Sequence, residues 1–183
     1  MSYAAAWRPD GLYFFLHVED PDRCPAESSD YAYQGDAVEV YVDADGFFPD
    51  LGEWDDRGAR SFGVAAPADD TTPSSRAGIY MLFAEVGPLN TDRFTAVPTP
   101  HGYDAEAFVV AEDLGLGSWS LSADDTVGID VGHDVSFPPG ESGRDGNRAG
   151  LYSLRLVTPP TDTVWDYPMY NENAFCTTTL LAP

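Results

Sequence analysis

The sequence contains no lysine, and its nine basic side chains, all arginine, stand against 31 aspartate and glutamate residues. The formal net charge is therefore −22 at pH 7. Without lysine the chain can form neither a Schiff base nor a phosphate-binding P-loop. Without a basic patch it lacks the electrostatic footprint that nucleic acids and anionic membrane surfaces attract. The composition thus argues against nucleic acid and acidic membranes as partners.

Long apolar runs and cysteine motifs are also missing. No stretch approaches the ~20 apolar residues of a membrane span, and the first residues do not have the pattern of a signal peptide. Cysteine occurs only as Cys24 and Cys176, with no Cys-x-x-Cys pair, so a structural zinc site is not expected. The two cysteines are compatible with one disulfide or with two buried thiols.

Apolar and polar residues alternate with a period of two along much of the chain. Leu12, Phe14, Leu16 and Val18 share one face of a predicted strand, and residues 37–43 repeat the pattern. Further strands are expected at about 59–66, 78–86, 93–97, 104–110, 126–134, 148–157 and 174–181. About nine strands and very little helix predict an all-β fold. We expect one antiparallel β-sandwich domain over residues 1–183, with jelly-roll or immunoglobulin-like layers.

Acidic residues gather after the strand at 37–43. Asp43 and Asp45 are followed by further acids, among them Asp55 and Asp56. Clustered carboxylates repel one another unless water or a cation intervenes, and Ca²⁺ takes six to eight such oxygen ligands. The spacing is not that of an EF-hand. The segment therefore predicts either a calcium site or a solvated acidic loop.

Aromatic residues are abundant, with 4 Trp, 10 Tyr and 10 Phe, and several stand among polar residues. The segments 30–35 and 164–171 combine rings with amides and acids. Such a mixture suits a sugar, whose C–H patches pack on a ring while its hydroxyls take hydrogen bonds. The alternative is that these rings cap the ends of the sandwich core.

The order of these segments resembles the family 9 carbohydrate-binding modules and their DOMON-like relatives. The most specific match is Gln34-Gly-Asp-Ala-Val-Glu-Val-Tyr-Val-Asp-Ala-Asp-Gly46, which is similar to the core signature of that family. The segment 10–20 looks like its "Asp-x-Leu-Tyr … Val-x-Asp" strand, and 103–116 looks like a later strand and turn, with Val110 at the expected proline. The resemblance extends through 125–134 and 173–180. The family's opening strand is not found ahead of residue 10, so Met1–Arg8 or a partner is expected to cover that sheet edge.

The resemblance implies a ligand site and a metal site. In the family two tryptophans hold the sugar, with arginine, amide and acidic side chains around it. The corresponding candidates here are Tyr33, Gln34, Arg60, Trp165 and Tyr170. The family also binds calcium structurally, which makes Asp43, Asp45, Asp55 and Asp56 the candidate ligands.

These features predict a non-catalytic module that binds a mono- or oligosaccharide outside the cell or in the periplasm, beside a catalytic domain or partner chain. No activated nucleophile or metal triad can be assembled from the motifs, so an enzyme is not expected. A second hypothesis is a DOMON-like electron-transfer domain that holds haem b, with His17, Met81 and Met169 as candidate axial ligands. A third is an adhesive or assembly module without a small ligand.

Overall fold

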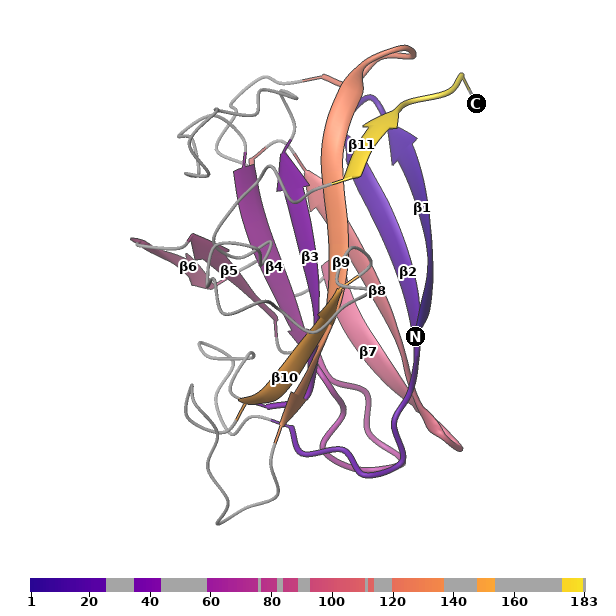
Figure 1. Ribbon diagram of the computed structural model, residues 1–183, viewed down its shortest axis with the longest axis vertical. Helices are drawn as coiled ribbons and strands as arrows, with labels where there is room; N and C mark the ends of the chain where they lie inside the picture. Colours follow the sequence, from indigo (N-terminus) through magenta and orange to yellow (C-terminus); the bar gives the residue numbers. More distant parts are fainter. Residues whose placement is uncertain are drawn as a thin grey trace.

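The protein is described by a computed structural model that defines residues 1–25, 35–43, 59–75, 77–81, 84–88, 93–110, 112–113, 120–136, 148–153 and 176–182. These ranges contain eleven strands and no α-helix. The strands form two antiparallel sheets that face one another as the layers of a sandwich (Figure 1). The predicted fold class is thereby confirmed. Within the same ranges there is no helix of the length and apolar character that a membrane crossing requires.

One layer is a four-stranded sheet with the spatial order β1-β2-β8-β7. Its strands are β1 (Ser2–Arg8), β2 (Gly11–Glu19), β8 (Gly102–Val110) and β7 (Phe94–Thr99). No family-like strand was expected ahead of residue 10, but β1 pairs with β2 along its whole length, from Ser2 opposite His17 to Arg8 opposite Gly11. Met1–Arg8 therefore supplies the cover for the edge of β2.

The other layer is a seven-stranded sheet with the order β10-β9-β3-β4-β5-β6, in which β11 also pairs with β9. Its strands are β10 (Arg148–Ser153), β9 (Thr126–Ser136), β3 (Ala37–Asp43), β4 (Ala59–Ala65), β5 (Ala77–Met81), β6 (Ala84–Pro88) and β11 (Cys176–Thr179). The prediction of a single strand at 78–86 is wrong, because β5 and β6 form an antiparallel pair there. A continuous apolar run cannot reveal a tight reversal within it.

The core lies between the two sheets and follows the predicted alternation. Val38, Val40 and Val42 of β3 pack in one buried cluster with Leu12, Phe14, Leu16 and Val18 of β2. Phe62 and Phe94 stack across the layers with ring centroids 6.2 Å apart. Since successive side chains of a strand point to opposite faces, the remaining residues of β2 and β3 face away from this core.

Candidate functional site

The outer face of the seven-stranded sheet is polar, yet buried. Glu39, Tyr41 and Asp43 alternate with the core valines of β3, and none is more than 4% exposed. Tyr41 lies opposite Asp130 of β9, which is fully buried as well. The Tyr41 hydroxyl donates a hydrogen bond to Glu39, and Asp130 accepts one of 2.7 Å from the Val131 N–H. Buried acids need such partners, so this face is built to keep polar groups in fixed positions.

Arg60 and Asp43 are the two predicted site residues that the structure describes. Asp43 ends β3 with no exposed surface, and Arg60 is 8% exposed near the start of β4. Arg60 pairs with Val42 and Asp43 pairs with Ala59, so the two site residues stand at the same end of the sheet. Their side chains start from opposite faces, because Arg60 shares the face of Val42.

The other predicted site residues lie outside the described residues. They are Tyr33, Gln34, Asp45, Asp55, Asp56, Trp165 and Tyr170. In the part of the chain that is described, no three His, Cys, Asp or Glu side chains are grouped as a metal site would need. The sugar and calcium assignments therefore stay predictions.

The haem hypothesis gains no support from the described candidates. His17 lies on the outer face of the four-stranded sheet, where its Nδ1 is 2.6 Å from Oδ1 of Asp104. Met81 belongs to β5 in the other layer, and Met169 lies outside the described residues. Because His17 points away from the other layer, His17 and Met81 are not brought together as an axial pair.

A cluster that the sequence analysis did not anticipate lies between the sheets at one end of the sandwich. His133 is 7% exposed, and its Nε2 lies 3.7 Å from Oδ2 of Asp20. The Tyr103 ring meets the His133 ring edge-on at 6.1 Å between centroids. Neither the Tyr103 hydroxyl nor His133 Nε2 has a hydrogen-bond partner among the described residues. The sequence contains one indication of this burial: alternation along β9 puts His133 on the same face as Val127, Ile129 and Val131.

Burial controls the titration of this cluster. It lowers the pKa of His133 to about 4, although the negative charge of Asp20 acts in the opposite direction. It raises the pKa of the neighbouring Asp36 to about 6, against hydrogen bonds from the N–H groups of Cys24 and Ser136 that favour the carboxylate. The pKa of the fully buried Tyr103 is raised for the same reason. At neutral pH these pKa values leave the imidazole of His133 uncharged.

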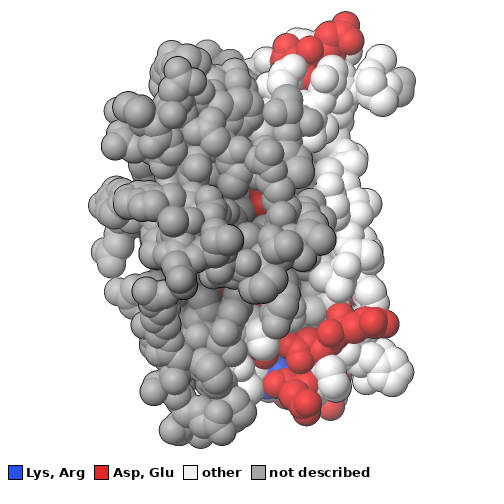
Figure 2. All heavy atoms as spheres, viewed as in Figure 1, with Lys and Arg blue, Asp and Glu red and all other residues white. Residues whose placement is uncertain are grey.

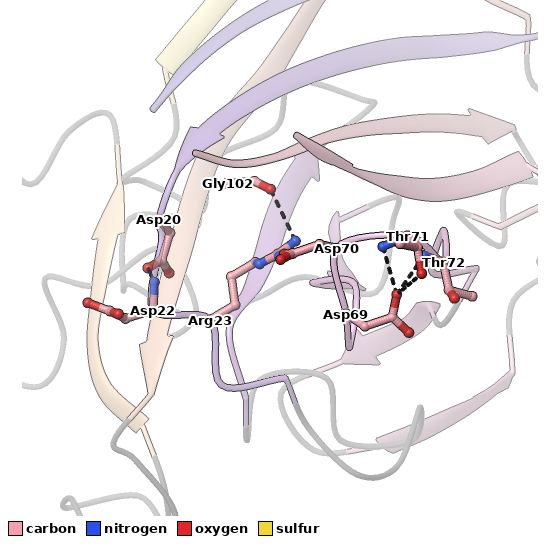
Figure 3. A network of polar contacts seen from close by, with 8 residues as sticks. All are labelled: Asp20, Asp22, Arg23, Asp69, Asp70, Thr71, Thr72 and Gly102. Atoms are coloured by element: carbon pink, nitrogen blue, oxygen red, sulfur yellow. Dashed lines mark hydrogen bonds and ion pairs between the residues drawn. The ribbon is translucent and has the colours of Figure 1, made fainter. Parts of the chain in front are cut away.

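The loop after β2 is anchored by the arginine next to this cluster. Arg23 donates a 3.1 Å hydrogen bond from Nη1 to the carbonyl of Gly102 and pairs with Asp70 (Figure 3). Beside Asp70, Asp69 accepts hydrogen bonds of 2.7 Å from the N–H groups of Thr71 and Thr72. These bonds, together with that from the Thr71 hydroxyl, lower the pKa of Asp69 to about 2. The contacts fix two loops at this end of the sandwich.

Cys24 lies in the same loop as a free thiol among the described residues. Of the two alternatives left open by the sequence, a disulfide between Cys24 and Cys176 is therefore not formed. The thiol is half-buried and contacts the carbonyl of Asp22 at 3.5 Å. Burial first, and then the negative charges nearby, raise the pKa of Cys24. This environment keeps the thiol protonated and unreactive at neutral pH.

Comparison with known proteins identifies the fold. No protein-family model and no curated protein matches the sequence. Among solved structures, a family 9 carbohydrate-binding module from Caldicellulosiruptor kristjanssonii in complex with glucose matches with a TM-score of 0.62 and 17% identity, over 99% of this chain and 76% of that chain. The chain has the fold of a family 9 carbohydrate-binding module. The same kind of module in complex with cellotriose matches equally, with a TM-score of 0.62 and 17% identity over 99% of this chain and 74% of that one.

The similarity extends over nearly the whole chain, so the family 9-like fold includes both sheets. The hydrogen bonds of Asp36 explain why an aspartate stands in the signature after Gly35. This pair immediately precedes β3, where the Asp36 carboxylate accepts hydrogen bonds from the backbone N–H groups of Cys24 and Ser136. The aspartate of the signature thus holds the end of the sandwich together.

Proposed function

We propose that this chain is a non-catalytic carbohydrate-binding module. The observation that carries the proposal is the match over 99% of the chain to modules whose structures contain glucose and cellotriose. The family 9-like fold, the aromatic-rich segments and the lack of basic surface are all compatible with a neutral sugar as ligand. Such a module would hold a glycan outside the cell while a catalytic domain or partner chain acts on it.

The proposed sugar site consists of Tyr33 and Trp165 as ring platforms, with Gln34, Arg60 and Tyr170 as further contacts. Arg60 supports this assignment by its position alone, near the start of β4 at the end of the sheet where Asp43 lies. Each ring–sugar contact contributes roughly 0.5–1.5 kcal/mol, so a modest affinity is expected.

Isothermal titration with glucose and with cellotriose tests the proposal. The parent should bind at least one of them, and Tyr33→Ala and Trp165→Ala should each weaken binding of glucose by roughly two- to tenfold. Tyr3→Ala is a matched control, because Tyr3 is an exposed tyrosine of β1 and belongs to no proposed site. Unchanged glucose affinity in both site variants would overturn the assignment, and a parent that binds no sugar would overturn the function.

We also propose that Asp43, Asp45, Asp55 and Asp56 hold a structural Ca²⁺. The donor set consists entirely of carboxylate oxygens, which is the chemistry that a hard divalent cation prefers. Asp43 supports the proposal as a fully buried acid at the end of β3, directly before the acidic segment. The cation would balance part of the negative charge there and would have no part in chemistry.

A further inference from the structure

The outer face of the four-stranded sheet carries a groove of about 550 Å³. This volume lies within the range of ~300–1,000 Å³ that is typical of small-molecule sites. The groove crosses all four strands, whereas Arg60 and Asp43 of the proposed sugar and calcium sites belong to the other sheet. It is therefore a separate feature of the fold.

The register of the sheet explains the shape of the groove. One wall is a row of directly paired residues: Ala4, Phe15, Glu106 and Thr95. The floor is the backbone of the next row, whose side chains start from the opposite face of the sheet: Ala5, Phe14, Ala107 and Phe94. The opposite wall is a second outward row of paired residues, Ala6, Tyr13 and Phe108, with Arg93 just before β7. The walls are thus two residues apart on every strand.

Aromatic rings dominate the walls. Phe15 is 42% exposed, which is unusual for a phenylalanine in the middle of a sheet. Tyr13 and Phe108 stack on one another at 4.0 Å between centroids and 12° between planes, so each covers one face of the other. The other face of Tyr13 is directed towards Ala6 on β1, an exposed and small residue that leaves it open. Phe15 is therefore the most exposed ring of the groove, and Tyr13 is half-buried beside it.

Polar groups flank the rings. Glu106 is exposed, and Thr95 is partly exposed beside it. Arg93 is 20% exposed and is fixed by a 2.7 Å hydrogen bond from Nη2 to Oδ1 of the buried Asp113. Further out, the Arg8 guanidinium lies over the stacked pair, 5.5 Å from the Tyr13 ring centre and 5.4 Å from that of Phe108. The groove thus combines rings with donors and acceptors in fixed places.

Charge selects the ligand class. The lining contains one cation, Arg93, and one anion, Glu106, in a chain of net charge −22. Figure 2 shows a largely uncharged surface along the side of the molecule where β1 and β2 lie, with acidic side chains gathered at its two ends. An acidic glycan, or a second copy of this acidic chain, would meet repulsion from these ends. A neutral ligand with apolar faces and hydroxyl groups meets none.

We propose that this groove is a second carbohydrate-binding surface, which takes a neutral oligosaccharide. Tyr13 and Phe15 supply the rings for sugar C–H faces, and Glu106, Thr95 and Arg93 take the hydroxyls. The proposal deepens the function proposed above and rests on it, since it adds a second point of attachment for the same ligand class. A second site on the same chain would raise the avidity for a polymer without any new contact at the first site.

The test uses a variant that fills the groove without removing a ring. Ala4→Arg places a long side chain on the wall at an exposed position of β1. Ser2→Arg is the matched control, because Ser2 lies on the same face of the same strand but outside the groove. A second pair is Phe15→Ala against Val97→Ala, which is 44% exposed on the same sheet and does not line the groove. Melting curves establish that all four variants fold.

Titration with cellohexaose is carried out in the parent and in a Tyr33→Ala/Trp165→Ala background. We expect two binding events in the parent and one in the background. In the background, Ala4→Arg should weaken binding at least tenfold and Phe15→Ala roughly two- to tenfold, and the two controls should leave it unchanged. If the parent binds cellohexaose but the Tyr33→Ala/Trp165→Ala variant does not, the groove is not a sugar site, while the proposed function stands.

The remaining outcomes are equally decisive. If the background binds like the parent and Ala4→Arg abolishes binding, the groove is supported and the first site assignment fails. If no protein binds sugar, both proposals fail. Sedimentation of the same variants tests self-association, and a parent dimer that Ala4→Arg converts to a monomer, without sugar binding, would make the groove a contact between copies and overturn the proposal.

Discussion

Ser136 donates a hydrogen bond of 2.6 Å from its backbone N–H to Oδ1 of Asp36, across 100 residues of sequence. The other carboxylate oxygen of Asp36 accepts a hydrogen bond from the Cys24 N–H. The backbone of Asp36 adds a bond of 2.9 Å from its N–H to the Cys24 carbonyl, and its own carbonyl accepts one of 2.9 Å from Ala66. One buried residue therefore connects the ends of β3, β4 and β9 and the loop after β2.

Replacement of Asp36 tests this role. Asp36→Ala leaves two backbone N–H groups without their acceptor, which costs about 2–5 kcal/mol in the free energy of unfolding. Asp36→Asn keeps one carbonyl oxygen and should lose less. Chemical denaturation measures both, with Asp10→Ala as control because its pairing with Arg8 is on the surface. A denaturation midpoint of Asp36→Ala equal to that of the control would contradict the connecting role.

The pH dependence of stability should contain two opposed contributions. The pKa of His133 is about 4 in the folded protein, below its ordinary value of 6.5. Its contribution to the free energy of unfolding is therefore complete above pH 6.5 and is lost as the pH falls towards 4. The pKa of Asp36 is raised from 3.8 to about 6, so the folded state gains stability as the pH falls from 6 towards 3.8. Each contribution is on the order of 3 kcal/mol, and the two have opposite signs.

Two variants separate these contributions. Relative to the parent, His133→Gln should become more stable on acidification from pH 6.5 to 4, since it removes the loss. Asp36→Asn should become less stable over the same interval, since it removes the gain. Urea denaturation at several pH values measures both differences, and slopes of equal sign in the two variants would refute the assignment. Asp20 and Arg23 face these groups in both variants and remain unchanged.

The alternation of residues carried much of the fold prediction, and its failures have local causes. The strand predicted at 37–43 coincides with β3, because valine alternates there with Glu39, Tyr41 and Asp43. Ser2–Arg8 was not recognised as a strand, since three consecutive alanines give no contrast between its faces. Its place at the edge of the four-stranded sheet also depends on β8 and β7, which are distant in sequence.

Tertiary neighbours also decide where candidate site residues lie. His17 and His133 both stand within strands, but the alternation of side chains puts His17 on the outer face of its sheet and His133 between the sheets. No pattern within a single strand reveals that His133 approaches Asp20, because that contact requires the two layers to pack. The groove on the four-stranded sheet is likewise a property of the register, which brings Phe15 beside Ala4 and Tyr13 beside Ala6.

The indole of Trp7 attaches the C-terminal segment to the edge strand. Its Nε1 donates a hydrogen bond of 2.8 Å to the carbonyl of Leu181, and its ring packs against the core. Trp7→Phe keeps an aromatic ring but removes the donor, so the free energy of unfolding should fall by about 1 kcal/mol. Hydrogen exchange should quicken at residues 180–182. Tyr3→Phe, at another aromatic position of β1, serves as control, and equal exchange in both variants would argue against the attachment.

Removal of calcium should lower the melting temperature if the proposed site is correct. A ligand at 100 times its dissociation constant stabilises the folded state by ~2.7 kcal/mol, which for a chain of this size corresponds to roughly 5–10 °C. A chelator added at fixed ionic strength should produce this decrease, and excess Ca²⁺ should reverse it. Asp45→Asn and Asp55→Asn should lose the response, while Asp69→Asn, whose carboxylate accepts hydrogen bonds within its own turn, should keep it. A melting curve that the chelator leaves unchanged would make the acidic segment a solvated loop.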